Sequence, residues 1–236
     1  VTYAESHDEE RLMFKNLSFG NTNADYNVKD LNTALKRMEL AGAFLFTIPG
    51  PKMLWQFGEL GYDYSIEYGC RVCNKPVRWD YYEVPNRERI YQVWGELIKL
   101  KTTYDVFSTN SFSLNVAGFG KRISLNSPTM NVTVLGNFDI NMANVIPAFQ
   151  HVGWWYEYFS GDSLYVNDVN ASMTMIPGEY RLYTDVRLST PEIVDGINDG
   201  EIISAQDIQA WPNPTTGEVQ LLTALTESSE VRIQIY

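Results

Sequence analysis

The sequence has few of the side chains that many enzyme classes depend on. Only two cysteines and two histidines occur among 236 residues, and lysine and arginine (18) are far outnumbered by aspartate and glutamate (29), for a net charge of −11. Such an acidic chain is a poor match for nucleic acid, since phosphate binding requires clustered Lys and Arg. No apolar run approaches the roughly 20 residues of a membrane-spanning helix. We therefore expect no nucleic-acid partner and no membrane span.

The two cysteines, Cys70 and Cys73, form a C-x-x-C motif. That spacing occurs in redox sites and as half of a zinc site. No second pair of ligands follows it, so a metal site is disfavoured, and we predict none. A disulfide in an oxidising compartment is the preferred interpretation, with two inert thiols as the alternative.

The composition is that of a globular protein, with 44% hydrophobic and 20% charged residues. Aromatic residues are abundant, which suits both β-sheet cores and surfaces that stack on sugar rings. The chain starts without Met, and its last residues alternate like an unfinished strand. We therefore expect this chain to be part of a longer polypeptide.

Residues 1–105 are predicted to alternate strand and helix. Short apolar segments at Val1–Ala4 and Met53–Phe57 indicate strands, and helical spacing of apolar residues covers 28–46 and 86–101. Two strands alone cannot close a barrel. The pattern fits the last two strands and helices of a (β/α)8 barrel.

From about residue 106 the pattern changes to short strands separated by Gly, Asn and Pro turns, for example at 122–125, 132–135 and 180–183. Residues 106–188 are therefore predicted to form an antiparallel β-sandwich. Residues 189–207 are polar and glycine-containing, typical of a linker, and a third segment covers 208–236. The predicted fold class is α/β followed by all-β.

His7 and Asp8 follow the first predicted strand, at the position where catalytic side chains gather in a barrel. Taken alone, the pair also fits an ordinary surface turn or a helix cap. Its surroundings are more informative, because five stretches resemble, in order and spacing, the alpha-amylase family of secreted bacterial type. They are residues 3–13, 49–61, 75–81, 155–161 and 177–183.

The resemblance implies a retaining enzyme acting on alpha-1,4-glucosidic bonds of starch-like polysaccharides, with an oxocarbenium-like transition state. It assigns to Asp8 the stabilisation of that state and to His7 hydrogen bonds to sugar hydroxyls. It places the nucleophile, the general acid and an arginine on earlier strands, so the rest of the barrel is an expected partner. No cofactor is expected within these residues, although the family often holds calcium through ligands located upstream.

Glu59 and Tyr62 lie in the loop after the second predicted strand and are candidate substrate-binding residues, with loop packing as the alternative. Trp154 and Trp155 are candidates for a sugar-stacking surface, although at least one of them is expected in the core. A glucan-branching or other transferring enzyme, and a non-catalytic glycan-binding protein, remain alternatives to hydrolysis.

The segment Ala210–Val219 is similar to the opening of a type IX secretion sorting domain, because a Pro-Asn-Pro turn precedes a strand. The resemblance implies interaction with type IX secretion machinery and a secreted or cell-surface location. Another short β module is the alternative.

Overall fold

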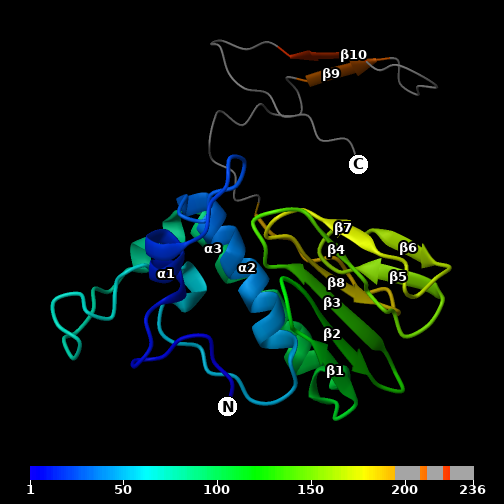
Figure 1. Cartoon of the computed structure of the whole chain (residues 1–236), viewed down its shortest axis with the longest axis horizontal. Coiled ribbons are helices and arrows are strands. Elements are labelled where there is room, and N and C mark those ends of the chain that lie inside the picture. The colour runs from blue at the N-terminus through cyan, green and yellow to red at the C-terminus, as the bar shows by residue number, and fades with distance from the viewer. Residues whose placement is uncertain (195–207, 212–219, 224–236) are drawn as a thin grey trace. The chain divides into compact units, whose positions relative to one another are not determined.

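The computed structural model describes residues 1–194, 208–211 and 220–223. The chain divides into two compact units, Val1–Ile197 and Asn198–Tyr236. In its described residues, the first unit contains three α-helices and a predominantly antiparallel β region (Figure 1).

The helical part of the first unit consists of α1 (Leu12–Phe19), α2 (Leu31–Thr47) and α3 (Pro85–Thr103). Asp30 caps α2 by accepting a hydrogen bond from the Thr33 amide, at 3.0 Å. Pro85 occupies the first turn of α3, where its missing N–H leaves no hydrogen bond unmade. The helices predicted at 28–46 and 86–101 are confirmed with shifts of a few residues. The short helix α1 was not predicted, because only Met13 is buried in it and its apolar pattern is weak.

Helices α2 and α3 pack closely because Gly42 has no side chain. The indole N–H of Trp94 on α3 donates to the Met38 carbonyl on α2, at 3.0 Å. A Cβ atom at Gly42 would lie 2.2 Å from that same nitrogen. Glycine is therefore required where the two helices meet.

Where two barrel strands were predicted, the structure has a single parallel bridge, between Thr2 and Lys52. The Thr2 amide donates to the Pro51 carbonyl at 2.9 Å, and the Met53 amide donates to the Thr2 carbonyl at 3.0 Å. The prediction of a buried strand at Met53–Phe57 is wrong. Its backbone leaves the pairing after Met53 and turns at Phe57, whose φ is +60°. A run of apolar side chains indicated burial in a sheet, but Leu54 and Gln56 are exposed here.

The main sheet has six antiparallel strands in the order β1-β2-β3-β8-β5-β6. The strands predicted at 122–125, 132–135 and 180–183 lie within β2, β3 and β8 and are confirmed. The bounds are β1 Phe112–Asn115, β2 Gly120–Asn126, β3 Asn131–Asn137, β5 Gly153–Glu157, β6 Ser163–Val166 and β8 Tyr180–Thr184. A second sheet pairs β4 (Ala143–Val145) with β7 (Met173–Met175).

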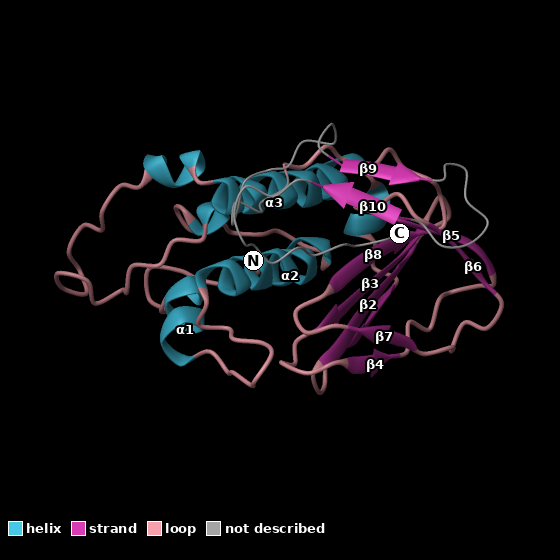
Figure 2. Ribbon diagram, turned by 90° about the horizontal axis from the view of Figure 1, so that it is seen from above, coloured by secondary structure: helices cyan, strands magenta, loops and turns pink. Residues whose placement is uncertain are grey.

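Different elements cover the two faces of the main sheet. On one face, Val132, Val134 and Leu182 belong to the core shared with α2 and α3. On the other, Leu135, Trp155 and Tyr183 pack with Val145 and Met175 of the small β4–β7 sheet. Figures 1 and 2 show the helices beside one side of the strands. The structure has one large antiparallel sheet with helices on one face and a short two-stranded sheet on the other, and the predicted β-sandwich domain is not confirmed.

The part of the first unit that the structure describes also has 3₁₀ helices at Gly58–Leu60 (η1), Trp79–Glu83 (η2) and Asp105–Ser108 (η3). In the second unit, β9 (Ile208–Trp211) pairs antiparallel with β10 (Gln220–Thr223). The Pro-Asn-Pro turn of the predicted sorting domain and most of the predicted linker lie outside the described residues.

Candidate functional site

Two loops lie side by side at one end of the helical part, because both follow the parallel Thr2–Lys52 bridge. The first loop contains residues 5–11, and the second runs from Trp55 into η1. In a parallel pair the segments after each strand emerge at the same edge, as at the mouth of a barrel. We call these two loops the rim.

A buried ion pair within the first rim loop contacts the second loop. Glu5 and Arg11 are each 3% exposed, and their carboxylate and guanidinium groups are 3.4 Å apart. Glu5 also accepts a hydrogen bond from the Leu12 amide at 2.9 Å, while Arg11 donates to the Gln56 carbonyl at 3.4 Å. Burial raises the pKa of Glu5 and lowers the pKa of Arg11, whereas their mutual attraction opposes both shifts.

Arg11 also holds the aromatic side chains of the second loop. Its guanidinium carbon lies 4.9 Å from the ring centre of Tyr62 and 5.7 Å from that of Trp55. The Glu5 carboxylate lies against the backbone of Gly58, where a Cβ atom would be 2.5 Å from the carboxylate oxygen. The ion pair thus fixes the distance between the rim loops.

His7 and Asp8 lie between Glu5 and Arg11 in the sequence and are open to solvent, with each side chain 70% exposed. His7 Nε2 is 3.2 Å from an Asp8 carboxylate oxygen, and the imidazole lies 5.7 Å from the ring of Trp55. The Asp8 amide donates to Ser6 Oγ at 3.1 Å. An exposed carboxylate, an imidazole and an indole therefore occupy one small area of the rim.

The backbone of Asp8 is fixed from the long loop that precedes α3. Arg71 donates from Nη2 to the Asp8 carbonyl at 2.8 Å and pairs with Glu67 at 2.8 Å. Arg71 lies between Cys70 and Cys73, which are joined by a disulfide with their Cα atoms 5.0 Å apart. The disulfide closes the turn from which Arg71 reaches the rim.

Glu59 lies on η1 and turns one carboxylate oxygen into the protein. Within the described residues, its buried Oε2 has no hydrogen-bond partner. Burial raises the pKa of Glu59, and the charge of Arg11 opposes that shift. The structure brings Glu59 close to the Glu5–Arg11 pair rather than into the exposed area around Asp8.

Tyr62 is 1% exposed, and its hydroxyl donates to the Pro76 carbonyl at 2.6 Å. Its ring stacks on Phe57, with ring centres 5.6 Å apart. These contacts correspond to the loop-packing alternative, and a substrate-binding role of Tyr62 stays a prediction. Its contribution is to support Arg11.

Sequence reasoning missed Glu5, Arg11 and Arg71 as site residues. A run of charged residues such as 5–11 ordinarily indicates a solvated loop, and no spacing in the sequence marks which of its members are buried. Trp55 lay within the predicted strand and received no role. Its position near the end of the predicted strand Met53–Phe57 was the available signal.

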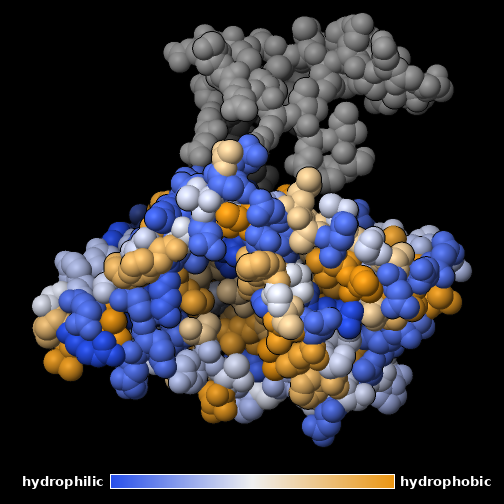
Figure 3. All heavy atoms as spheres, viewed as in Figure 1, coloured by the Kyte–Doolittle hydropathy of each residue, from blue (hydrophilic) through white to orange (hydrophobic). Residues whose placement is uncertain are grey.

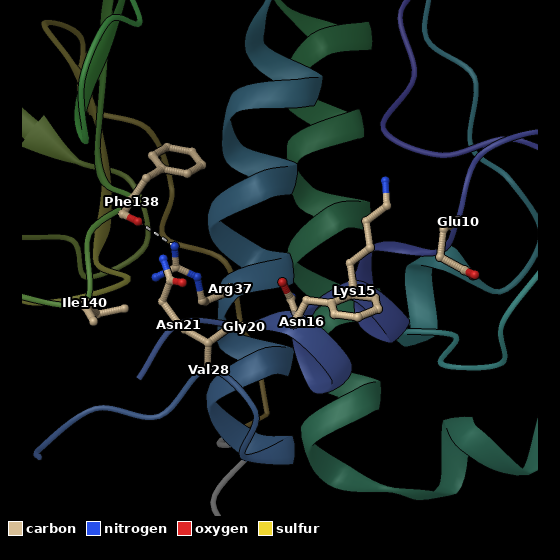
Figure 4. Close-up of a pocket in the computed structure, with 10 residues that line it drawn as sticks. Glu10, Lys15, Asn16, Gly20, Asn21, Val28, Arg37, Phe138 and Ile140 are labelled. Carbon is tan, nitrogen blue, oxygen red and sulfur yellow. Dashed lines mark hydrogen bonds between the residues drawn. The ribbon is translucent and has the colours of Figure 1, made fainter. Parts of the chain in front are cut away.

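An open cavity of about 470 Å³ lies between α1, α2 and the loop after β3. Arg37 crosses it and donates to the Phe138 carbonyl at 2.7 Å (Figure 4). Neither His7, Asp8 nor Glu59 lines this cavity. Glu10 of the first rim loop does line it.

No group of three or more His, Cys, Asp or Glu side chains in the described residues is placed to hold a metal ion. Among the helices of the same residues, none has the length and apolar content of a membrane crossing.

Comparison with known proteins identifies the fold. No family model matches the sequence, and no curated protein matches it. Solved structures do match. A variant of AmyP in complex with maltotriose has a TM-score of 0.57 and 13% identity, over 80% of this chain and 41% of that protein. The alpha-amylase from Geobacillus thermoleovorans, complexed with acarbose, has a TM-score of 0.54 and 10% identity, over 77% and 38%.

A cyclomaltodextrinase matches with a TM-score of 0.57 and 17% identity, over 78% of this chain and 29% of that protein. These neighbours are enzymes of the alpha-amylase family, whose catalytic domains are (β/α)8 barrels. This chain spans less than half of the length of each of the three. The similarity shows the fold that the chain shares with part of these enzymes.

Proposed function

We propose that this chain is the C-terminal part of a retaining alpha-glucan hydrolase of the alpha-amylase type, and that Asp8 faces the substrate from the rim. The observation that carries the proposal is the exposed Asp8 carboxylate beside His7 and Trp55, on a loop fixed by a buried ion pair. The fold shared with enzymes crystallised with maltotriose and acarbose supports it.

Asp8 would act by electrostatics. Breaking a glucosidic bond places positive charge on the sugar ring in the transition state, and a fixed carboxylate stabilises that charge more than it stabilises the ground state. Rigidity matters here because a preorganised group does not need to reorient during the reaction. The Arg71 and Ser6 contacts to the Asp8 backbone supply that rigidity.

His7 would hydrogen-bond sugar hydroxyls, and the Trp55 ring beside it would contact an apolar sugar face. Glu59, whose pKa is raised by burial, would act through the Glu5–Arg11 pair that positions the rim. The nucleophile and the general acid would come from barrel strands that precede this chain in a longer polypeptide. In that polypeptide the remaining strands would also cover the backbone at Thr2 and Lys52.

The location is part of the proposal. The Cys70–Cys73 disulfide fits a protein that reaches an oxidising compartment. A secreted or cell-surface enzyme exported by type IX machinery would meet starch outside the cell. Calcium, if used by the complete enzyme, would be bound outside this chain.

Product analysis tests the hydrolase against its alternatives. The longer polypeptide containing this chain and the preceding barrel strands should release reducing sugar from starch, whereas the 236-residue chain alone should release none. New alpha-1,6 linkages without net release would support a branching enzyme. Starch binding without any change in the polymer would support a non-catalytic glycan-binding protein. Release of reducing sugar by the chain alone would contradict the proposed division of the active site.

A further inference from the structure

The adjacent tryptophans of β5 lie on opposite faces of the sheet. Trp155 is fully buried, packs on Phe149 and donates its indole N–H to the His151 carbonyl at 3.1 Å. Trp154 is 53% exposed. The prediction that at least one of the two is in the core is confirmed, and only Trp154 remains available to a ligand.

The structure gives Trp154 an aromatic partner that sequence adjacency did not indicate. Tyr165 of β6 is the direct cross-strand partner of Trp154 and is 52% exposed. Their ring centres are 5.2 Å apart at an interplanar angle of 78°. Tyr156 projects from the same face two residues along β5, and the Arg187 guanidinium lies over its ring at 5.5 Å. We call Trp154, Tyr156 and Tyr165 the aromatic ledge.

The ledge lies on the edge strands of the sheet. β6 ends the strand order, and β5 separates it from β8. Tyr156 pairs with Thr184, which pairs with Val132, so the ledge continues the face that packs on α2 and α3. Figures 1 and 2 both show β5 and β6 at the end of the sheet farthest from α1. The rings therefore lie where the helices no longer cover the sheet.

The surroundings of the rings favour a neutral, hydroxyl-rich ligand. Exposed Ser163 lies opposite Tyr156 on β6, and Asp162 and Arg187 are also exposed. Hydrophilic side chains intermingle with hydrophobic ones over the β region in the space-filling view (Figure 3). The exposed rings of Trp154 and Tyr165, even together with exposed Val152 and Val186 nearby in the sequence, are much smaller than the roughly 800 Å² per partner of a stable protein interface. The net charge of −11 disfavours a polyanion.

We infer that the aromatic ledge is a second carbohydrate site, which binds a segment of an alpha-glucan polymer away from the rim. The apolar faces of successive glucose units would stack on Trp154 and Tyr165, and their hydroxyls would bond to the polar groups around the rings. The choice of an alpha-glucan rests on the proposed function. The site itself rests on the exposure and pairing of the rings.

Electrophoresis of the 236-residue chain through native gels with and without amylopectin tests the inference. Amylopectin in the gel should slow the migration of the chain. Trp154→Ala should raise the apparent dissociation constant for amylopectin by about tenfold, as loss of a central aromatic contact does. Tyr165→Ala should weaken binding in the same direction. Trp154→Phe keeps a ring and should retain part of the binding.

The chain offers a matched control in Tyr82 and Tyr91. Their rings also meet edge to face, with centres 5.2 Å apart at 86°, and they are 43% and 47% exposed. The double variant Tyr82→Ala/Tyr91→Ala should be slowed as much as the unaltered chain. Circular dichroism melting of every variant confirms that it is folded.

Three results would overturn the inference. They are unchanged mobility of the native chain in amylopectin, equal retardation of folded Trp154→Ala, and equal loss of retardation in the Tyr82/Tyr91 control. None of them depends on hydrolysis. If the longer polypeptide proved inactive while Trp154-dependent binding persisted, the ledge would stand and the proposed enzymatic function would fall.

Discussion

At the scale of single residues, the ion pair between Glu5 and Arg11 determines how the rim is built. Each charge is almost completely buried, and each is compensated by the other and by backbone groups of the neighbouring segments. A buried pair of this kind adds little net stability, but removing one partner leaves an uncompensated charge. The pair therefore acts mainly by fixing the loops that present His7 and Asp8.

Substitution of Gly58 tests this arrangement. In Gly58→Ala the new methyl group would lie 2.5 Å from Glu5 Oε1, so the carboxylate oxygen that pairs with Arg11 must shift. We expect the free energy of unfolding to fall by about 1–3 kcal/mol, the usual cost of overpacking. Urea denaturation monitored by fluorescence measures it.

Gly95 on α3 provides the control, because a Cβ atom there meets nothing within 4 Å. Gly95→Ala should leave stability unchanged or raise it by up to about 1 kcal/mol through helix propensity. Adding Glu5→Ala to Gly58→Ala should remove part of the cost of the glycine substitution. Equal stability of Gly58→Ala and Gly95→Ala would show that Glu5 does not constrain position 58.

At the scale of secondary-structure elements, α3 is tied to its surroundings through a partly buried lysine near its end. Lys101 donates from Nζ to the Ile48 carbonyl at 2.9 Å and to the Phe107 carbonyl at 3.2 Å. Burial lowers the pKa of Lys101 to about 8, and the nearby charge of Lys52 acts in the same direction. The charged form is therefore less favourable in the folded chain than in the unfolded one.

This shift predicts how stability depends on pH. Between pH 8 and the ordinary lysine pKa of 10.5, the unfolded chain binds more protons at this position than the folded chain. The contribution of Lys101 to stability should therefore rise over that interval. Relative to Lys101→Met, the native chain should gain melting temperature between pH 7.5 and pH 10.

Lys99→Met is the matched control on the same helix, since Lys99 is largely exposed and pairs with Glu96 at 3.0 Å. The difference in melting temperature between Lys99→Met and the native chain should change much less between pH 7.5 and pH 10. The lowered pKa of Lys101 would be contradicted if the difference in melting temperature between the native chain and Lys101→Met stayed constant with pH or changed in the opposite direction.

The elements differed in how far the sequence could predict them. Helices α2 and α3 and strands β2, β3 and β8 were predictable because their apolar residues recur at the helix or strand period over a whole element. The strand prediction at Met53–Phe57 was wrong because an apolar run shows only that side chains avoid water. It does not show whether a neighbouring strand pairs with the backbone. The short α1 gave too few periods to be recognised.

The site was predictable only where a motif marked it. His7 and Asp8 were found through a resemblance over several stretches, and the structure places both on the exposed rim. The burial of Tyr62 could not be predicted, because aromatic residues in a loop suit either packing or sugar contact. The pairing of Glu5 with Arg11 and of Trp154 with Tyr165 depends on the fold of the intervening chain.

At the scale of the whole molecule, the described part of the first unit combines the rim, built on the parallel Thr2–Lys52 bridge, with a β region that carries its own exposed aromatic ledge. An acidic chain with these surfaces suits a neutral polysaccharide, which its charge does not repel. The rim would perform chemistry only together with the remaining barrel strands. The ledge would bind without them.

The most direct test of the proposed function is the turnover number of Asp8→Asn in the longer polypeptide that contains this chain, measured on starch. Asparagine keeps the size of the side chain but removes the negative charge, so we expect kcat to fall by about a hundredfold or more. Asp168→Asn replaces an exposed carboxylate whose Oδ1 accepts from the Asn170 amide, and it should turn over starch like the unaltered enzyme. Equal kcat values for Asp8→Asn and Asp168→Asn would contradict the account.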